Sequence, residues 1–347
     1  MCSKVEPPSH LGGTSRRGKM KLIVQIPCFN EEQTLGETLR DIPRRVPGVN
    51  TVEVLVLDDG STDRTVEVAK ESGADHIISL GQHEGLARAF MAAIDASLRL
   101  GADLIVNTDA DNQYDGRDIQ TLITPILEGR AEMVIGDRQI DALDHFSPIK
   151  KVLQKVGSWV VRQASNTDIP DTTSGFRAYT KRAALRLTVF SDFTYTLETL
   201  IQAGHKGIQV THVPVRTRAN TRPSRLIKSN WNYLTRSIAT IVRVYAMYRP
   251  LAVFSLIGGV LLLGGFAISA RFLYYYVQGG SGGKVQSLIL SAVLILLGFQ
   301  ILMIGLLSDL VSANRRLMED ILLRLKWLSL SAKDDSGQAG HRWEEPR

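Results

Sequence analysis

Apolar and polar positions follow a repeated order over the first part of the chain, in which a short apolar run leads through a polar turn into a helix. The first run is KLIVQIP at residues 21–27. Further runs are VEVLVLD at 52–58, HIISL at 76–80, DLIVNTDAD at 103–111 and EMVIGDR at 132–138. Such runs, bounded by Gly, Pro, Asp and Asn, are typical of short buried strands.

Helical stretches of 10–15 residues separate these runs. NEEQTLGETLRDIP at residues 30–43 has Asn30 as its expected N-cap, and EGLARAFMAAIDASLRLG at 84–101 ends at the stop signal Gly101. Strands that alternate with helices predict an α/β fold, here a Rossmann-like, mostly parallel sheet with helices on both faces. In such sheets ligands bind at the carboxyl ends of the strands.

The apolar pattern changes after residue 250. Residues 251–270 and 285–308 contain no charged residue, and each stretch has the roughly 20 residues needed to cross a hydrocarbon core about 30 Å thick. We therefore expect two transmembrane helices, at about 251–272 and 285–308. The alternative is a buried helical hairpin in a soluble protein.

The charges that flank the two stretches predict the topology. Lys and Arg cluster before the first span and after the second, whereas the loop between them holds only Arg271 and Lys284. By the positive-inside rule the N-terminal domain and both termini face the cytoplasm, so the chain is expected in the cytoplasmic membrane. The N-terminus has no apolar stretch, which predicts no cleavable signal peptide.

Composition changes this picture little. Apolar residues make up 44% of the chain, charged residues 22%, and the net charge is +6. The basic excess lies near the spans, which favours anionic lipid over nucleic acid as its partner. The two cysteines, Cys2 and Cys28, provide neither a disulfide framework nor metal-ligand spacing, as in a reducing compartment.

Five regions follow from these patterns. Residues 1–19 are expected to form a disordered tail, 20–225 the α/β domain, 226–249 an amphipathic helix at the membrane interface, 250–310 the two transmembrane helices, and 311–347 a cytoplasmic tail. IKKVLQKVGSWVVR at 149–162 could form a second interfacial helix or pack on the domain.

Acidic residues follow the fourth apolar run. Asp109, Asp111 and Asp115 lie in NTDADNQYDG, and carboxylates this close repel one another unless a cation or hydrogen bonds offset the repulsion. A calcium-binding EF-hand loop is excluded, because Tyr114 stands where glycine is needed and Gln120 where an acid is needed. A solvated turn remains possible. The other possibility is a divalent cation, Mg²⁺ or Mn²⁺, held by Asp109, Asp111 and Gln113 and completed by a substrate diphosphate.

Two neighbouring turns could bind the nucleotide of such a diphosphate. In LDDGSTD, Asp59 could accept hydrogen bonds from a base edge or a ribose hydroxyl. In PCFNEEQTL, Phe29 could pack on a base and Glu31 could accept from it. Gly85, at the start of the third helix, would let backbone N–H groups approach a phosphate. Each turn could instead serve only to cap a helix.

The motifs PCFNE, LDDGSTD, HEGLARA, DADNQ, GDR and SGF, in this order, resemble glycosyltransferase family 2 with the GT-A fold. With TRPSRL and the two C-terminal spans, residues 21–310 resemble the polyisoprenyl-phosphate glycosyltransferases, the group that includes dolichol-phosphate mannose synthase.

The resemblance implies roles for individual residues. The nucleobase pocket would be lined by Pro27, Phe29, Glu31 and Asp59. The metal and the sugar diphosphate would be held by Asp109, Asp111 and Gln113. The remaining functional residues would be Arg138, the acceptor-side Ser174, and the phosphate-binding Arg222, Ser224 and Arg225. The chain departs from the family pattern at Asn112 (usually Leu), Asp137 (usually Ser), Pro223 (usually an acid) and Arg225 (usually Lys).

The expected activity is inverting transfer of a sugar from a UDP- or GDP-linked donor to a polyisoprenyl phosphate, with a divalent cation, by a chain that could form a homo-oligomer. The acceptor could instead be another lipid or a glycan, and the chain could be a non-catalytic nucleotide-sugar-binding scaffold. A processive polysaccharide synthase is disfavoured because Q-x-x-R-W is missing from the sequence. A nucleotidyltransferase is disfavoured because GGTSRR at residues 12–17 precedes the first strand instead of following it.

Overall fold

The computed structural model describes residues 19–139, 167–189, 195–218, 250–279 and 285–336. These residues fall into two compact units, an N-terminal α/β unit and a C-terminal pair of long helices. Most of the predicted disordered tail, both predicted interfacial helices, and Arg222, Ser224 and Arg225 lie outside the described residues.

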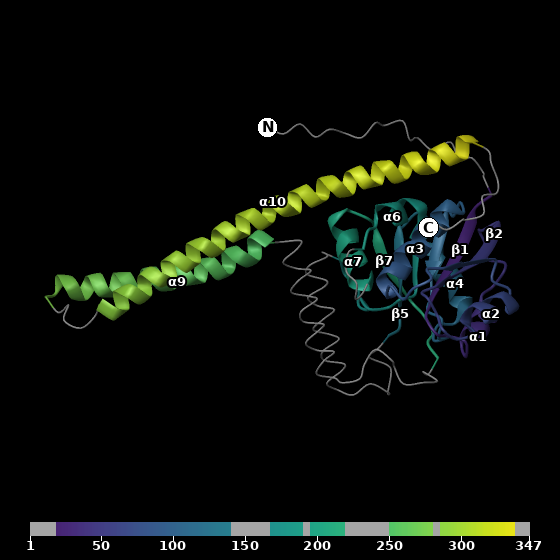
Figure 1. The fold of residues 1–347 in the computed structure, drawn as a ribbon, viewed down its shortest axis with the longest axis horizontal. Coiled ribbons are helices and arrows are strands. Elements are labelled where there is room, and N and C mark those ends of the chain that lie inside the picture. Colours follow the sequence, from purple (N-terminus) through teal and green to yellow (C-terminus); the bar gives the residue numbers. More distant parts are fainter. Residues whose placement is uncertain (1–18, 140–166, 190–194, 219–249, 280–284, 337–347) are drawn as a thin grey trace. The chain divides into compact units, whose positions relative to one another are not determined.

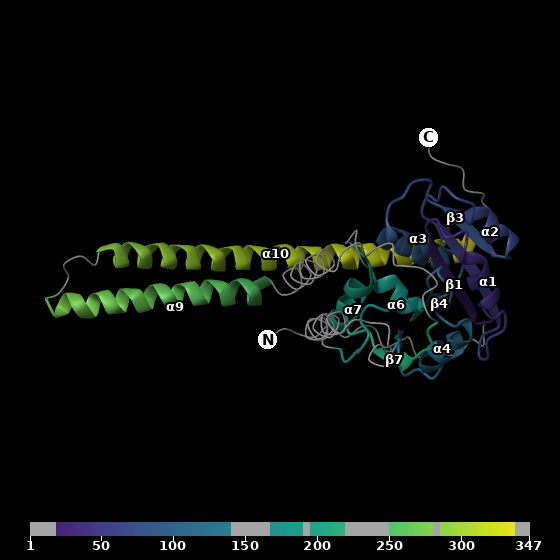
Figure 2. The same cartoon turned by 90° about the horizontal axis from the view of Figure 1, so that it is seen from below.

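The α/β unit is built on one sheet, which has seven strands in the described part of the chain. The strands are β1 (Lys21–Cys28), β2 (Thr51–Asp58), β3 (His76–Ser79), β4 (Leu104–Asn107), β5 (Met133–Asp137), β6 (Arg177–Thr180) and β7 (Val210–Pro214). The helices are α1 (Leu35–Asp41), α2 (Thr65–Glu71), α3 (Leu86–Arg99), η1 (Gly116–Asp118), α4 (Ile119–Leu127), α6 (Lys181–Arg186) and α7 (Tyr195–His205). Figures 1 and 2 show helices on both sides of the sheet, which confirms the predicted layered α/β fold.

The strand order is β3-β2-β1-β4-β6-β5-β7. The pairs of β1 with β2 and β4, of β2 with β3 and of β5 with β7 are parallel. Strand β6, which the sequence pattern did not predict, is antiparallel to both β4 and β5. Because β6 runs the other way, the turn that precedes it reaches the edge of the sheet at which β4 and β5 end.

Alternate residues of β1 point to the two helical layers, as the two-residue period of a strand requires. Leu22, Val24 and Ile26 are fully buried in an apolar cluster with residues of α1, α2 and α4. On the opposite face Gln25 accepts a hydrogen bond from Ser97 of α3 at 3.3 Å. A sheet with both faces covered explains why the strands are nearly continuous apolar runs.

One helix boundary differs from the prediction. The first helix begins at Leu35 and has Thr34 as its N-cap, so the assignment of Asn30 as the cap was wrong. Asn30 has a left-handed backbone (φ 56°), and its side-chain oxygen accepts from the Thr62 N–H at 2.8 Å. Asn tolerates this conformation better than most residues, so here it joins two turns instead of starting a helix.

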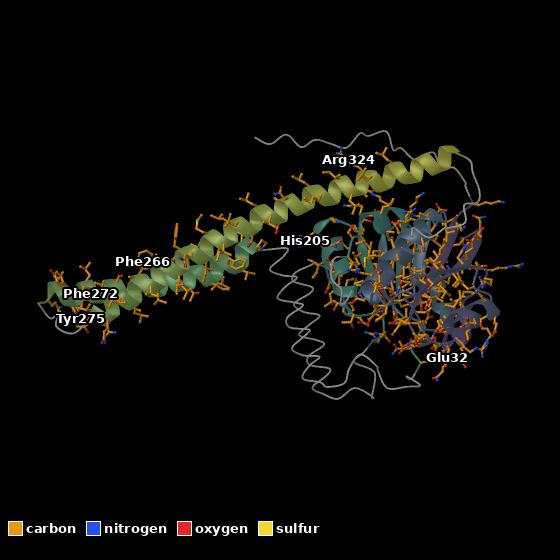
Figure 3. The ribbon with its side chains drawn as sticks, in the orientation of Figure 1. Glu32, His205, Phe266, Phe272, Tyr275 and Arg324 are labelled. Atoms are coloured by element: carbon orange, nitrogen blue, oxygen red, sulfur yellow. The ribbon has the colours of Figure 1, made fainter. Side chains whose placement is uncertain are left out.

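The C-terminal unit consists of α9 (Pro250–Val277) and α10 (Val285–Ser336). Both contain candidate membrane spans, at Pro250–Val277 and Val285–Asn314, and these include the predicted 251–272 and 285–308. Large apolar side chains face outward, and Phe266 is 58% exposed. Phe272 and Tyr275 lie near the end of α9 that leads toward α10 (Figure 3). Such a surface suits lipid.

Small residues let the two long helices approach closely. A methyl group added at Gly258 would lie 2.8 Å from the carbonyl oxygen of Gly298, and one added at Gly298 would lie 2.9 Å from that of Gly258. Ser291 donates a hydrogen bond to the Gly265 carbonyl at 2.9 Å. Close backbone approach through glycine and serine is typical of transmembrane helix pairs.

Candidate functional site

The predicted site residues converge at the edge of the sheet where the parallel strands end. Strands β2, β1 and β4 are neighbours, so the turns that carry Asp59, Phe29 and Asp109 leave the sheet side by side. The turn at Ser174 reaches the same edge because it precedes the antiparallel β6. Arg138 follows β5 there as well. A single edge therefore carries the carboxylates, the aromatic residue and the arginine that the sequence singled out.

Asp109 and Asp111 lie in the acidic loop (residues 108–118), which follows β4. Within the described part of the chain neither carboxylate forms an ion pair. Burial, and next the negative charge of Asp111, raises the pKa of Asp109 from 3.8 to about 7. These two carboxylates form no ion pair among the described residues, and burial disfavours the charged form of Asp109. They are therefore a candidate binding site for a positive ion.

The donor set fits a hard divalent cation whose other ligands come from substrate. Among the described residues no group of three or more His, Cys, Asp or Glu side chains is placed to hold a metal, so the candidate ligands there are the two carboxylates and the Gln113 amide oxygen. Mg²⁺ and Mn²⁺ are commonly bound in this way, by one or two carboxylates together with phosphate oxygens and water. Gln113, the third predicted ligand, is partly exposed in the same loop.

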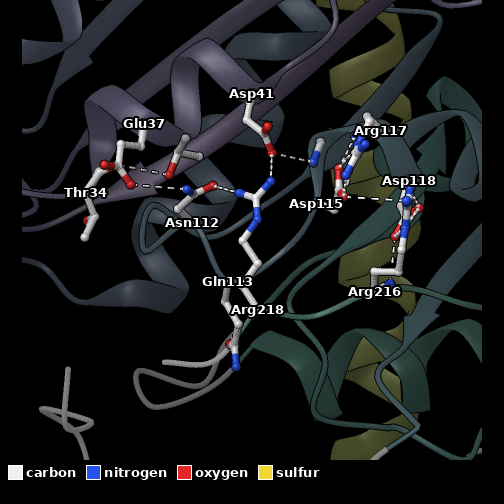
Figure 4. Close-up of polar contacts among 12 residues, drawn as sticks. Thr34, Glu37, Asp41, Asn112, Gln113, Asp115, Arg117, Asp118, Arg216 and Arg218 are labelled. Atoms are coloured by element: carbon white, nitrogen blue, oxygen red, sulfur yellow. Dashed lines mark hydrogen bonds and ion pairs between the residues drawn. The ribbon is translucent and has the colours of Figure 1, made fainter. Parts of the chain in front are cut away.

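The other acids of the loop are already neutralised (Figure 4). Asp115 forms an ion pair with Arg117 at 2.6 Å, and the Arg117 hydrogen bond lowers the pKa of Asp115 to about 2. Asp118 accepts hydrogen bonds from the Arg216 backbone N–H at 2.7 Å, from its Nε at 3.0 and 3.3 Å, and from its Nη2 at 2.5 Å. The structure thus separates the acids that stabilise the loop from the pair at residues 109 and 111.

The SGF turn packs directly against Asp109. A methyl group added at Gly175 would lie 2.7 Å from both carboxylate oxygens of Asp109 and 3.0 Å from the Tyr195 hydroxyl oxygen. Asn107, at the end of β4, donates to the Gly175 carbonyl at 2.9 Å and to the Tyr195 hydroxyl at 3.0 Å. Glycine is therefore required here for space, and a buried polar network sets the distance between the turn and the carboxylate.

Arg177 stabilises the SGF turn through hydrogen bonds to backbone carbonyl oxygens. Its fully buried guanidinium donates to the carbonyl oxygens of Ser174 at 2.7 Å, Thr172 at 2.9 Å and Thr196 at 2.8 Å. A buried charge that is hydrogen-bonded on all sides stiffens the backbone it binds. Ser174 itself is fully buried, and its hydroxyl lies 3.4 Å from that of Tyr114.

Arg138 is held in place by a partner that the sequence did not reveal. Its Nε and Nη2 donate to the two carboxylate oxygens of Asp171, at 2.7 and 3.0 Å, and Nη2 also donates to the Thr173 hydroxyl at 2.8 Å. Although burial raises the pKa of a carboxyl group, the hydrogen bonds and charge of Arg138 outweigh it and hold the pKa of Asp171 below its usual value. A two-pronged pair of this kind fixes the guanidinium plane.

On the nucleotide side, His83 joins the residues that the sequence predicted. Its ring stacks on that of Phe29 with centroids 3.9 Å apart, and its Nδ1 lies 2.8 Å from a carboxylate oxygen of Asp59. Asp59 also accepts from the backbone N–H groups of Glu84 at 2.8 Å and Gly85 at 2.9 Å. In this structure the Gly85 N–H is therefore directed at Asp59.

The remaining predicted nucleotide-side residues lie close by. Pro27 is buried within β1 beside Leu57 of β2. Glu31 accepts a hydrogen bond from the Thr34 hydroxyl at 2.9 Å. The turn at Gly60 lies against the backbone of Gln82 and His83, since a methyl group added there would lie 2.6 Å from the Gln82 carbonyl carbon. The loop before α3 thus packs against the turn after β2.

Comparisons with known proteins identify a family model and relatives that are similar in sequence. Residues 23–187 match the family model described as Glycosyl transferase family 2. Glycosyltransferase AglJ of Haloferax volcanii is 29% identical over 86% of this chain and 96% of its own length. Undecaprenyl-phosphate 4-deoxy-4-formamido-L-arabinose transferase of Salmonella choleraesuis is 27% identical over 88% of this chain and 92% of its own.

Among solved structures, glucosyl-3-phosphoglycerate synthase from Mycobacterium tuberculosis, crystallised with Mn²⁺, UDP and glucosyl-3-phosphoglycerate, is similar with a TM-score of 0.53. It is 22% identical in sequence, and the match covers 66% of this chain and 81% of that one. This likeness confirms the predicted GT-A fold of the α/β unit.

Proposed function

We propose that this chain, whose residues 23–187 match the model of glycosyltransferase family 2, transfers a sugar from a nucleotide diphosphate sugar to a polyisoprenyl phosphate. The observation that carries the proposal is the pair Asp109 and Asp111, which has no counter-ion among the described residues and follows a strand beside the Phe29 and Asp59 turns. Two apolar helices and relatives named for undecaprenyl-phosphate transfer support a lipid-linked acceptor.

The donor would lie across the carboxyl ends of β1, β2 and β4. Phe29 and His83 offer aromatic surface for the base, and Glu31 offers an acceptor oxygen. Asp109, Asp111 and Gln113 would hold a divalent cation. When bound, that cation neutralises charge on the leaving nucleoside diphosphate. The fixed guanidinium of Arg138 would add a positive charge near Asp109.

The acceptor would approach from the segment that follows β7. Arg222, Ser224 and Arg225 would bind its phosphate, and a helix at residues 226–249 would lie on the cytoplasmic leaflet, with the catalytic unit and both chain ends in the cytoplasm. A phosphate monoester is already an anion at pH 7, so it can attack the anomeric carbon without a general base. Direct attack opposite the departing diphosphate inverts the configuration at that carbon.

The proposed function can be tested with membranes that contain the expressed chain, supplied with polyprenyl phosphate and a panel of radiolabelled UDP- and GDP-sugars. We expect one of these donors to label the lipid fraction, and EDTA to remove the label while added Mn²⁺ restores it. Membranes with Asp95→Asn should label normally, because this side chain lies on α3, is 40% exposed and pairs with Arg99 outside the predicted site. Labelling that survives EDTA would contradict the cation site, and no transfer to lipid from any donor would contradict the acceptor.

Arg225→Ala tests the acceptor side separately. If Arg225 binds the acceptor phosphate, we expect about a 10- to 100-fold rise in the KM for polyprenyl phosphate, because a charge-assisted contact to phosphate is lost. The affinity for the nucleoside diphosphate, measured by calorimetry, should change less than about twofold. Arg182→Ala, an exposed arginine paired with Glu132 at 3.5 Å, is the matched control. An equal loss of donor affinity would show that Arg225 belongs to the donor site.

A further inference from the structure

The residues that follow β7 form backbone hydrogen bonds with the acidic loop. We name residues 215–218 the β7 extension. The Arg218 N–H donates to the Gln113 carbonyl oxygen at 2.8 Å, and Thr217 forms an antiparallel bridge with Tyr114. Gln113 and Tyr114 are two and three residues after Asp111. The β7 extension therefore lies against the part of the acidic loop that carries the two unpaired carboxylates.

The Arg218 side chain joins this loop to α1 (Figure 4). Its Nη1 donates to Asn112 Oδ1 at 2.6 Å, and its Nη2 donates to Asp41 Oδ2 at 2.9 Å. The same Asp41 oxygen accepts the Gly116 N–H at 2.9 Å. One planar guanidinium thus joins Asn112, the residue that follows Asp111, to the end of α1, a geometry that a lysine ammonium cannot reproduce.

Asn112 is the residue that allows this connection. It lies between Asp109–Ala110–Asp111 and Gln113 and has a left-handed backbone, with φ 55°. Asn adopts this conformation several times more often than most residues, whereas a leucine carries a larger cost there. Asn112 also supplies the oxygen to which Arg218 donates. Asn therefore suits both the backbone and the partner.

We propose that Arg218 and Asn112 form a positioning pair that holds residues 109–113 in the conformation in which both carboxylates can bind one divalent cation. The pair joins that loop to the β7 extension. The cation and donor are those of the proposed function, on which this inference rests. Both residues act through the loop.

If the ion pair of Arg218 with Asp41 served only to stabilise the fold, its removal would change different measured quantities. The side chains of Arg218 and Asp41 are 40% and 28% exposed, and exposed pairs of this kind contribute about 0–1 kcal/mol to stability. A purely structural pair would thus alter the melting temperature slightly and leave cation binding unchanged. A positioning pair would leave the melting temperature nearly unchanged and weaken cation binding.

The test measures Mn²⁺ binding by electron paramagnetic resonance on the full chain in detergent, with UDP or GDP present. We expect about a 10-fold weaker Mn²⁺ affinity in Arg218→Ala and in Asn112→Leu, with melting temperatures within about 2 °C of wild type. Arg218→Ala combined with Asn112→Gly should bind Mn²⁺ no more weakly than Arg218→Ala alone, because both substitutions remove the Arg218–Asn112 hydrogen bond. Arg130→Ala, which removes a surface pair with Glu128, is the control.

Asn112→Gly separates the backbone from the hydrogen bond, because glycine adopts a positive φ freely but offers no side-chain oxygen. We expect its Mn²⁺ affinity to fall as in Arg218→Ala, and Asn112→Asp, which keeps the oxygen, to retain most of the affinity. Wild-type affinity in both Arg218→Ala and Asn112→Gly would overturn the proposal, as would a wild type that binds no Mn²⁺ with either nucleotide. A wild type that binds Mn²⁺ but transfers no sugar to polyprenyl phosphate would overturn the proposed acceptor alone.

Discussion

Asp109→Asn is expected to lower the rate of sugar transfer about 1,000-fold or more, without lowering the stability of the fold. The substitution keeps the size of the side chain but removes one of the two charges that would bind the divalent cation, and electrostatic terms of this kind dominate transfer reactions. Mn²⁺ binding with nucleotide should be lost in parallel. Asp95→Asn on the surface of α3 should keep both.

In EDTA, the Asp109→Asn variant should be as stable as the wild type or more stable. Because burial and Asp111 raise the pKa of Asp109 to about 7, the folded state carries an ionised carboxylate at a cost above that pH. The unfolded chain ionises near pH 4, so the wild type loses stability relative to the variant as the pH rises from about 4 to 7. We expect the variant to melt about 2–4 °C higher at pH 8 and nearly equally at pH 4.

Two results would contradict this account of Asp109. A variant with normal Mn²⁺ binding and more than a tenth of wild-type activity would show that Asp109 is not a cation ligand. A variant that melts well below wild type at pH 8 would show that the carboxylate stabilises the fold through contacts that its neutral isostere cannot make.

Gly175→Ala is expected to have the second-largest effect, a fall of about 100-fold in kcat with a folded protein. The added methyl group would lie 2.7 Å from both carboxylate oxygens of Asp109, closer than side-chain carbons approach, so the carboxylate or the turn must shift. A shift of about 1 Å at a reacting centre can cost 100-fold in rate. The backbone at Gly175 has no positive φ, so the effect comes from space alone.

The readouts are kcat, Mn²⁺ affinity and the melting temperature. Mn²⁺ affinity should fall with kcat, since the methyl group acts on a cation ligand. Gly259→Ala is the matched control, because a methyl group at that glycine of α9 meets nothing within 4 Å. Wild-type kcat and Mn²⁺ affinity in Gly175→Ala would show that the packing of the SGF turn on Asp109 has no catalytic consequence.

Several parts of the site could be predicted because they are local in sequence. Asp109 and Asp111 come directly after the buried run of β4, and the first two apolar runs end at Phe29 and Asp59 in the same way. In a parallel sheet those ends meet at one edge, so spacing alone brought these residues together. The two spans could be predicted for a similar reason, since length and the absence of charge suffice.

The partners of these residues could not be predicted in this way. Arg138 binds Asp171, Asn107 binds Tyr195, and Arg218 binds Asn112, pairs that are 33, 88 and 106 residues apart. No periodicity connects such positions. Strand β6 escaped prediction because it begins with Arg177, a charged residue that the fold buries, and so is not an apolar run.

The sequence by itself determined the layered α/β fold, the two apolar helices and the acidic turn after the fourth strand, because each depends on short-range pattern and burial. Only the tertiary structure decided which acids of that turn are neutralised. Arg117 and Arg216 neutralise Asp115 and Asp118, whereas Asp109 lies against Gly175 without a cation partner among the described residues. Charge pairing depends on distances across the folded chain, and these are set when the antiparallel β6 and the β7 extension pack beside β4.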